Sequence, residues 1–142
     1  MLVSQVLKEK GDLVFTISPD ESVADAAALL YERQVGAAVV MGAGGAVAGI
    51  LSERDLVRVV ALNGAEGMGR PVSACMTRQV IFAALDETID SLLARMTDRR
   101  VRHLPVLKDG RLVGLVSIGD LVKRKIAETE AEREELKAYI AA

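Results

Sequence analysis

The chain has 142 residues and a formal net charge of −2, from 18 lysines and arginines against 20 aspartates and glutamates. Apolar residues make up 51% of it and aromatic residues only 3%, so valine, leucine, isoleucine and alanine must build its core. The near-neutral charge and scarce aromatic rings argue against a nucleic-acid-binding surface, and no apolar run approaches the about 20 residues needed to cross a bilayer.

The first half of the chain reads as a short strand, a helix, a hairpin and a second helix. Val23, Ala26, Ala27 and Leu30 recur at the i, i+3, i+4, i+7 spacing of an amphipathic helix. A glycine-rich turn at 42–45 between two apolar runs is typical of a hairpin. The predicted elements are a strand at 15–17, a helix from 23, strands at 37–41 and 46–51, and a helix that begins at 52.

The second half of the chain repeats the first. Asp20-Glu21-Ser22-Val23 reappears as Asp86-Glu87-Thr88-Ile89, a shift of 66 residues. One repeat alone would bury too little apolar surface to be stable, so we expect the two to pack together about a pseudo-two-fold axis. The repeated elements are a strand at 79–81, a helix from 89, strands at 103–107 and 111–116, and a helix that begins at 117.

The sequence therefore predicts a mixed α/β (α+β) fold of two βαββα repeats with a C-terminal helical extension. The stretch that separates the repeats contains three glycines and a proline, which is typical of a linker. The predicted boundaries are 3–62 for the first repeat, 63–71 for the linker, 72–126 for the second repeat and 127–142 for the extension.

Two matching motifs carry a resemblance to a known family. Gly49-Ile50-Leu51-Ser52-Glu53-Arg54-Asp55-Leu56 and Gly114-Leu115-Val116-Ser117-Ile118-Gly119-Asp120-Leu121 stand at the same place in the two repeats, and the second repeat adds Arg102-His103-Leu104-Pro105-Val106. Over about residues 3–126 the chain resembles a stand-alone tandem pair of cystathionine-β-synthase (CBS) domains, a Bateman module. The resemblance implies a sensor that binds adenosine-containing nucleotides in the cleft between its repeats.

Each repeat places a serine and an aspartate where a strand ends and a helix begins. A helix N-terminus suits a phosphate, and a carboxylate can accept two hydrogen bonds from a ribose diol. The resemblance implies that Asp55 and Asp120 bind ribose and that Ser52 and Ser117 accompany them. The same spacing also forms a capping box that satisfies the backbone of the helix, and both roles are compatible.

The basic residues differ between the repeats. Arg102 and His103 begin a strand of the second repeat where the first has no basic residue, whereas Arg54 belongs to the first repeat only. We predict one phosphate site made by Arg54, Arg102 and His103 across the pseudo-two-fold axis, because guanidinium groups bind phosphate bidentately. Thr77 and Arg78 are further candidates for phosphate contact. The alternative for His103 is a histidine satisfied within its strand.

An adenine ring needs an apolar slot, which aliphatic side chains must supply in a chain with so few aromatic residues. The resemblance places the ring against the strand that opens each repeat and against the strand after the helix. The candidate lining residues are Thr16, Ile17, Ala37 and Val80. For Ile17 and Val80, core packing accounts for the residue type equally well.

The sequence predicts no catalytic residue and no metal site. One cysteine, Cys75, excludes an internal disulfide, and with one histidine it is too little for a zinc cluster. We expect Cys75 to be a small buried hydrophobe. The sequence has no phosphate-binding loop and no dinucleotide fingerprint.

The final helix is expected to run on from Asp120 past Glu128. Its residues at 4, 3, 4, 3, 4 spacing form a heptad seam with two polar interruptions: Val122, Ile126, Thr129, Arg133, Leu136 and Ile140. This seam is too weak to hold a coiled coil alone, but added to a larger surface it would support the homodimer that the resemblance implies.

We therefore expect a cytoplasmic, non-enzymatic regulatory module that binds AMP, ADP, ATP or NAD(H) and signals to a separate, unknown protein. Neither nucleic acid nor a membrane is an expected partner. One alternative is a structural interaction module with vestigial pockets, whose segment 127–142 docks a partner. The other is a nucleotide-hydrolysing enzyme with His103 as its general acid or base.

Overall fold

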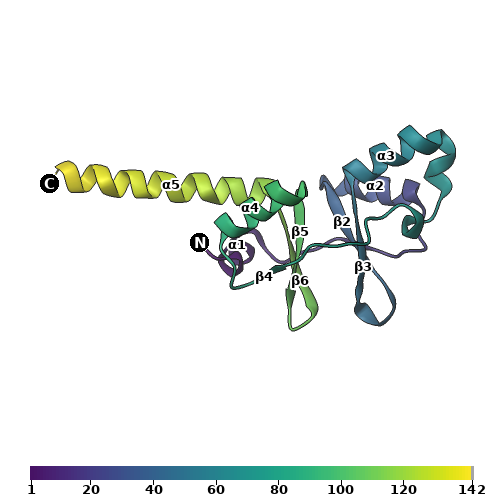
Figure 1. The fold of residues 1–142 in the computed structure, drawn as a ribbon, viewed down its shortest axis with the longest axis horizontal. Coiled ribbons are helices and arrows are strands. Elements are labelled where there is room, and N and C mark those ends of the chain that lie inside the picture. The colour runs from purple at the N-terminus through teal and green to yellow at the C-terminus, as the bar shows by residue number, and fades with distance from the viewer. Residues whose placement is uncertain (142) are drawn as a thin grey trace. The chain divides into compact units, whose positions relative to one another are not determined.

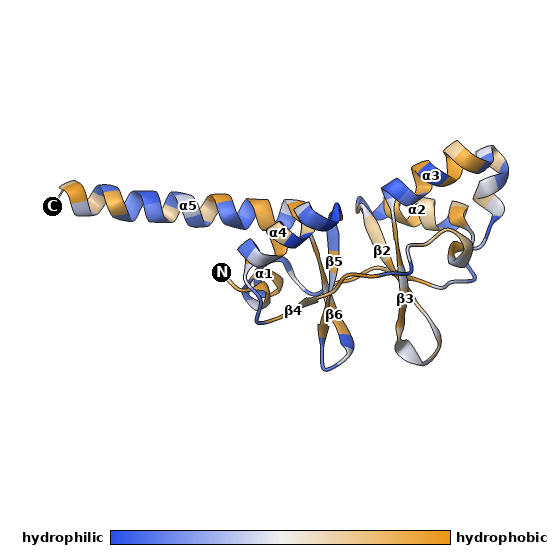
Figure 2. Cartoon of the chain, in the orientation of Figure 1, coloured by the Kyte–Doolittle hydropathy of each residue, from blue (hydrophilic) through white to orange (hydrophobic). Residues whose placement is uncertain are grey.

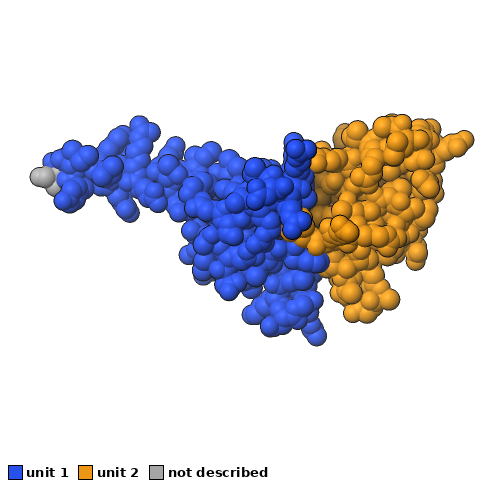
Figure 3. Space-filling view, in the orientation of Figure 1, with its two compact units in different colours: residues 1–13, 82–142 blue, residues 14–81 orange. Residues whose placement is uncertain are grey.

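The computed structural model describes residues 1–141, which form two compact units. Unit 1 comprises Met1–Leu13 and the chain from Phe82 onward, and unit 2 comprises Val14–Ile81 (Figures 1 and 3). Each unit contains one three-stranded sheet. None of the helices among the described residues combines the length and the apolar run that crossing a membrane requires.

Unit 2 contains the elements of the first repeat. In its sheet β1 pairs in parallel with β2, and β2 pairs antiparallel with β3. The side-chain oxygen of Ser22 accepts a hydrogen bond from the backbone of Asp25 and so caps α2. The elements are β1 (Thr16–Ile17), α2 (Val23–Arg33), β2 (Ala37–Met41), β3 (Val47–Ser52), α3 (Glu53–Asn63) and three 3₁₀ turns, η1 (Ala43–Gly45), η2 (Gly64–Gly69) and η3 (Val72–Ala74).

Unit 1 has the same sheet topology, with β4 parallel to β5 and β5 antiparallel to β6. Thr88 caps α4 as Ser22 caps α2. The tight turn between β5 and β6 has positive φ angles at Asp109 and Gly110, which suit a two-residue hairpin. The elements are α1 (Val3–Lys10), β4 (Ala83–Ala84), α4 (Ile89–Arg99), β5 (His103–Lys108), β6 (Arg111–Ser117) and α5 (Ile118–Ala141).

The mixed α/β fold with two repeated units and a C-terminal helix is confirmed. The opening strand predicted at Gln79–Ile81 is wrong, because the second sheet begins at Ala83. The segment that precedes the predicted strand pairs with the first sheet instead, since Thr77 forms a bridge with Ile50 of β3. The linker predicted at 63–71 begins in the last residue of α3 and continues as the turn η2.

The core of unit 2 is a continuous aliphatic cluster between the sheet and the helices. Cys75 belongs to it and is buried as a free thiol, as expected. Each fully buried valine or leucine contributes about 1.5–3 kcal/mol to stability. The cluster consists of Ile17, Val23, Ala26, Leu30, Ala38, Val40, Leu51, Val59, Val72, Cys75 and Met76.

In unit 1 the N-terminal helix α1, which the sequence did not predict, packs with the elements of the second repeat. The backbone of Val3 and Ser4 donates hydrogen bonds to Glu87 and Leu85 at 2.9 and 3.0 Å. Unit 2 likewise contains the segment that leads into the second repeat, from η3 to Ile81. The buried apolar residues of unit 1 include Val3, Val6, Leu7, Ile89, Leu92, Met96, Leu104, Val106, Val116 and Leu121.

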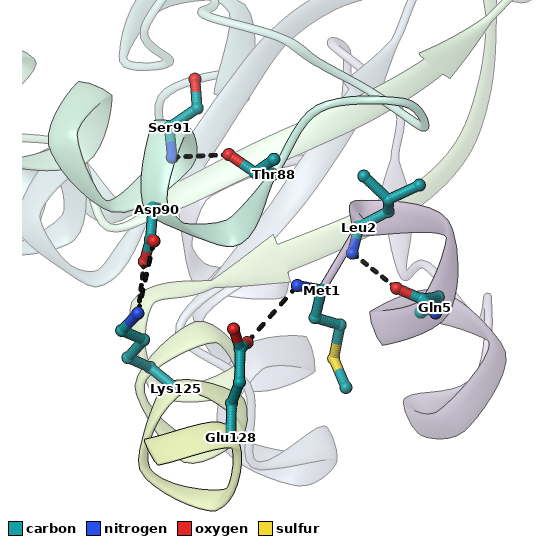
Figure 4. Close-up of polar contacts among 8 residues, drawn as sticks. All are labelled: Met1, Leu2, Gln5, Thr88, Asp90, Ser91, Lys125 and Glu128. Carbon is teal, nitrogen blue, oxygen red and sulfur yellow. Dashed lines mark hydrogen bonds and ion pairs between the residues drawn. The ribbon is translucent and has the colours of Figure 1, made fainter. Parts of the chain in front are cut away.

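The first turns of α5 are fixed to unit 1 by charged contacts as well as by the buried Leu121. Figure 4 shows Lys125 against Asp90, with Nζ 3.0 Å from the carboxylate, and the Met1 ammonium 3.4 Å from Glu128. Beyond these contacts the helix runs on to Ala141 (Figure 1). Its side chains at 129–141 are exposed.

Candidate functional site

Both Ser-x-x-Asp motifs lie at the start of the last helix of their repeat and form the capping interaction that was one of the two expected roles. The side chain of Ser52 accepts a hydrogen bond from the backbone of Asp55, whose carboxylate accepts one from the backbone of Ser52 at 2.9 Å. Ser117 and Asp120 repeat this exchange at 3.1 and 2.8 Å. The two acids are therefore placed alike by the backbone.

The two acids differ in their surroundings. Asp55 is the only charged residue among residues 1–141 that is buried, with 2% of its surface exposed. Its Oδ2 atom accepts hydrogen bonds from the backbone and the hydroxyl of Ser52. Its Oδ1 atom accepts one from the Thr77 hydroxyl at 3.1 Å and pairs with the Arg58 guanidinium at 2.8 Å. Arg58 also donates to the carbonyl of Cys75.

Asp120 keeps 26% of its side chain exposed. Its Oδ2 atom accepts a hydrogen bond from Lys10 of α1 at 2.6 Å and one from the backbone of Ser117 at 2.8 Å. Partial burial raises the pKa of Asp120, but the hydrogen bonds from Lys10 and Ser117 outweigh this, so its pKa lies below the ordinary value. The Asp120 carboxylate is thus ionised at neutral pH and partly open to solvent.

The first turn of each helix has few backbone donors left for a phosphate. The N–H of Glu53 donates to the carbonyl of Gly36 at 3.0 Å, and that of Ile118 donates to the carbonyl of Arg102 at 2.8 Å. The N–H groups of Asp55 and Asp120 are used by the caps. A phosphate near either helix would therefore depend on side chains for most of its hydrogen bonds.

The predicted phosphate-binding residues belong to different units. Arg102 and His103 stand at the start of β5 in unit 1, Arg102 exposed and His103 half-buried, and Arg54 lies exposed on α3 of unit 2. His103 pairs with Ser117 across β5 and β6, so unit 1 itself brings His103 next to the Ser117–Asp120 motif. A joint site of all three basic residues stays a prediction.

The remaining predicted residues all lie in unit 2. Ala37 is buried and pairs with Ser52 across β2 and β3, which is the position that His103 occupies in unit 1. Ile17 is buried in the apolar cluster, whereas Thr16 beside it is exposed. Val80 is half-buried outside any strand.

The candidate phosphate contacts Thr77 and Arg78 are engaged within unit 2. The Thr77 hydroxyl donates to Asp55, and Arg78 donates to the carbonyl of Ser73 at 2.8 Å. Both side chains are therefore already committed to internal hydrogen bonds.

Sequence reasoning missed the two cations that contact the acids. Arg58 follows Asp55 by three residues on a helix, a spacing that brings side chains together and could have identified the pair. Lys10 is 110 residues from Asp120, and no local pattern connects them. Among the described residues no group of three or more histidine, cysteine or acidic side chains could hold a metal ion.

The chain as a whole is similar to several known proteins. The chain is 35% identical to the mitochondrial CBS domain-containing protein CBSX3 of Arabidopsis thaliana over 97% of its own length and 71% of that protein. The crystal structure of the CBS-domain containing protein ATU1752 from Agrobacterium tumefaciens matches with a TM-score of 0.85 and 44% identity, covering 87% of this chain and 92% of that one.

A third similar protein was solved with ligands. The CBS domain pair of MJ0100, in complex with 5′-methylthioadenosine and S-adenosyl-L-methionine, matches with a TM-score of 0.80 and 25% identity, covering 90% of this chain and 98% of that one. The CBS domain family model matches residues 11–62 and 72–126. The chain therefore belongs to the CBS domain family, as a tandem pair of CBS domains.

Proposed function

We propose that this chain is a non-enzymatic regulatory module that binds an adenosine-containing ligand on unit 1. The observation that carries the proposal is the Asp120 carboxylate, ionised and partly exposed at the start of α5 beside Ser117. A carboxylate in this state can accept both hydroxyl hydrogens of a ribose. The likeness to a CBS pair crystallised with two adenosine derivatives supports the same ligand class.

The groups around Asp120 suit a ligand with a negatively charged end. The cationic groups near this acid in the fold are Lys10, whose Nζ lies 2.6 Å from it, and Arg102, whose carbonyl accepts the first N–H of α5. His103 stands across the sheet from Ser117. AMP, ADP, ATP and NAD(H) carry the phosphates that such groups bind, so they are the ligands to test beside the two adenosine derivatives.

Regulation requires that the ligand prefer one arrangement of the chain by a few kcal/mol and that a second protein recognise it. The exposed seam of α5 suits a second copy of the chain, because a two-fold axis brings the same apolar residues together. Figure 2 shows apolar and polar patches alternating along this helix, and Leu136 and Ile140 are among its exposed apolar side chains. We propose a homodimer whose geometry a separate protein reads.

Titration calorimetry tests the ligand proposal. The folded chain is titrated with AMP, ADP, ATP, NADH, 5′-methylthioadenosine and S-adenosyl-L-methionine, with guanosine monophosphate as the control for base specificity. We expect at least one adenosine compound to bind with a dissociation constant below millimolar and the guanosine compound to bind at least tenfold more weakly. Absence of binding by all six adenosine compounds at millimolar concentration would refute the proposal.

A structural interaction module is the second candidate, favoured by the exposure of Leu136, Tyr139 and Ile140 near the end of α5. This candidate predicts that a protein partner binds equally well with and without nucleotide. It also predicts that the partner is lost when the chain is cut after residue 126. A nucleotide that changes partner affinity would exclude it.

A further inference from the structure

The carboxylate of Asp55 is fully occupied by the protein itself. A carboxylate offers about four lone-pair positions on its two oxygens. In Asp55 the backbone and hydroxyl of Ser52 take two on Oδ2, and Thr77 and Arg58 take two on Oδ1. With 3% of the side chain exposed, solvent hardly reaches this group.

A ribose could bind Asp55 only by displacing some of these donors. Replacing the Thr77 hydroxyl would leave it without its acceptor, and replacing Arg58 would separate a charge pair at 2.8 Å. Thr77 and Arg58 are exposed and could bond to water instead, so the loss falls on the buried Asp55 carboxylate, which would exchange a charged donor for a neutral hydroxyl. The hydrogen bonds that a ribose diol would form with Asp55 would therefore add little net binding free energy.

Arg58 and Thr77 are themselves held in place. The guanidinium that pairs with Asp55 also donates to the carbonyl of Cys75 at 2.9 Å. The backbone of Thr77 exchanges hydrogen bonds with Ile50 of β3, at 2.9 and 3.0 Å. Three segments of unit 2 therefore meet at this carboxylate: the start of α3, the end of β3 and the chain after η3.

The Asp120 carboxylate has fewer of its hydrogen-bonding positions occupied by protein groups than the Asp55 carboxylate has. The bonds from Lys10 and the backbone of Ser117 both arrive at Oδ2, so neither uses the other carboxylate oxygen. The position of Arg58 in the first repeat is taken in the second by Lys123, whose side chain is exposed. A ligand at Asp120 needs to displace at most one flexible lysine, which can move to a phosphate instead.

We propose that each chain takes one adenosine-containing ligand, at Asp120, and that Arg58 and Thr77 close the first Ser-x-x-Asp motif so that Asp55 serves as a structural acid. This inference rests on the proposed function for the identity of the ligand. The closure of Asp55 rests on the contacts of unit 2 alone. The ligand proposal and the closure of Asp55 can therefore fail separately.

Native mass spectrometry and calorimetry with 5′-methylthioadenosine and AMP test the stoichiometry. We expect one ligand per chain, a loss of affinity of at least thirtyfold in Asp120→Asn, and a change of less than threefold in Asp55→Asn. Circular dichroism of both variants checks that each one folds. Two ligands per chain, or binding that depends on Asp55 instead of Asp120, would overturn the inference.

Labelling of carboxylates with a water-soluble carbodiimide and an amine tests the closure without any ligand, first in the native chain. We expect the native chain to be labelled at Asp120 at least tenfold faster than at Asp55. The double variant Arg58→Gln/Thr77→Val should make Asp55 reactive. Equal labelling of the two acids in the native chain would overturn the inference. If no probe binds but Asp55 is protected, the proposed function fails while the closure stands.

Discussion

Lys10 on α1 and Asp120 at the start of α5 are in direct contact, with Nζ 2.6 Å from Oδ2, although 110 residues separate them in the sequence. The Lys10 ammonium also donates to the carbonyl of Leu115 at 2.7 Å. One side chain thus connects the N-terminal helix to both the last strand and the last helix of unit 1. Any ligand that binds the Asp120 carboxylate therefore affects the contact between Asp120 and Lys10.

Replacement of Lys10 by methionine should make the chain less stable at neutral pH and remove part of its acid sensitivity. Burial opposes ionisation of Asp120, yet the bonds from Lys10 and Ser117 prevail and lower its pKa. A lowered carboxyl pKa adds stability above the unfolded value of about 3.9, and this is lost as pH falls through the folded pKa. For a pair whose side chains are about a quarter exposed, the contribution is about 1 kcal/mol.

Urea unfolding of the native chain, Lys10→Met, Asp120→Asn and the double variant measures this effect. We expect a coupling free energy of about 1 kcal/mol at pH 7 that disappears well below pH 4. Glu87, whose pKa is lowered chiefly by the hydrogen bond from Arg95, adds its own acid sensitivity, which the cycle cancels. A coupling that is the same at both pH values would contradict the prediction.

Lys10 should also influence which ligands bind. Because its ammonium lies against Asp120, it competes with a ribose but attracts a phosphate. We expect Lys10→Met to bind 5′-methylthioadenosine as tightly as the native chain or more tightly, and to bind AMP several-fold more weakly. Lys8→Met, on the same helix and exposed, is the matched control. Equal changes for both ligands would show that Lys10 does not distinguish them.

The fold was predictable where one side of a helix or strand is buried, because apolar residues then recur at a regular spacing in the sequence. The strand Ala37–Met41 and the helix that starts after Ser52 are both where the pattern placed them. α1 was missed because its apolar residues do not pack on neighbours in sequence: Val3 and Val6 are buried within unit 1, which the second repeat completes.

The two candidate acids could also be found from the sequence, but the difference between the contacts of their carboxylates could not. Asp55 and Asp120 share one motif and one cap. What separates them is Thr77 in one unit and Lys10 in the other, and both come from segments that lead into a repeat and are distant in sequence. Such long-range contacts depend on the packing of a whole unit, which no local spacing reveals.

Two matched glycines should tolerate alanine unequally. A Cβ at Gly49 would lie 2.7 Å from the sulfur of Met76 and 2.8 Å from the carbonyl of Thr77, and a backbone carbonyl in a strand pairing cannot retreat. A Cβ at Gly114 would meet only the Leu7 side chain, with its two methyl carbons at 2.7 Å and its Cγ at 3.3 Å, and a side chain can change rotamer.

We therefore expect Gly49→Ala to lower the free energy of unfolding by about 1–3 kcal/mol and Gly114→Ala to lower it by less. Thermal and urea unfolding compare the two variants directly. Because the Thr77 carbonyl belongs to the segment that closes Asp55, Gly49→Ala should also speed carbodiimide labelling of Asp55. A larger loss in Gly114→Ala would show that Leu7 is the more rigid neighbour.

The seam of α5 should contribute to self-association. Leu136 and Ile140 are 60% and 74% exposed, and each would contribute about 1.5–3 kcal/mol if buried between two copies. Sedimentation equilibrium at micromolar concentration should give a native species of twice the chain mass of 15.1 kDa. Leu136→Glu/Ile140→Glu should weaken the dimer at least tenfold, because it places like charges at the seam.

The control pair is Ala131→Glu/Ala138→Glu, which adds the same charge to exposed positions on the opposite side of the helix. It should leave the mass unchanged, because alanine and glutamate both favour a helix and neither position lies on the seam. A native chain that sediments only as a single 15.1 kDa species would refute the homodimer. A dimer that survives the seam variant would instead place the contact on the compact units, because the seam residues would then be dispensable.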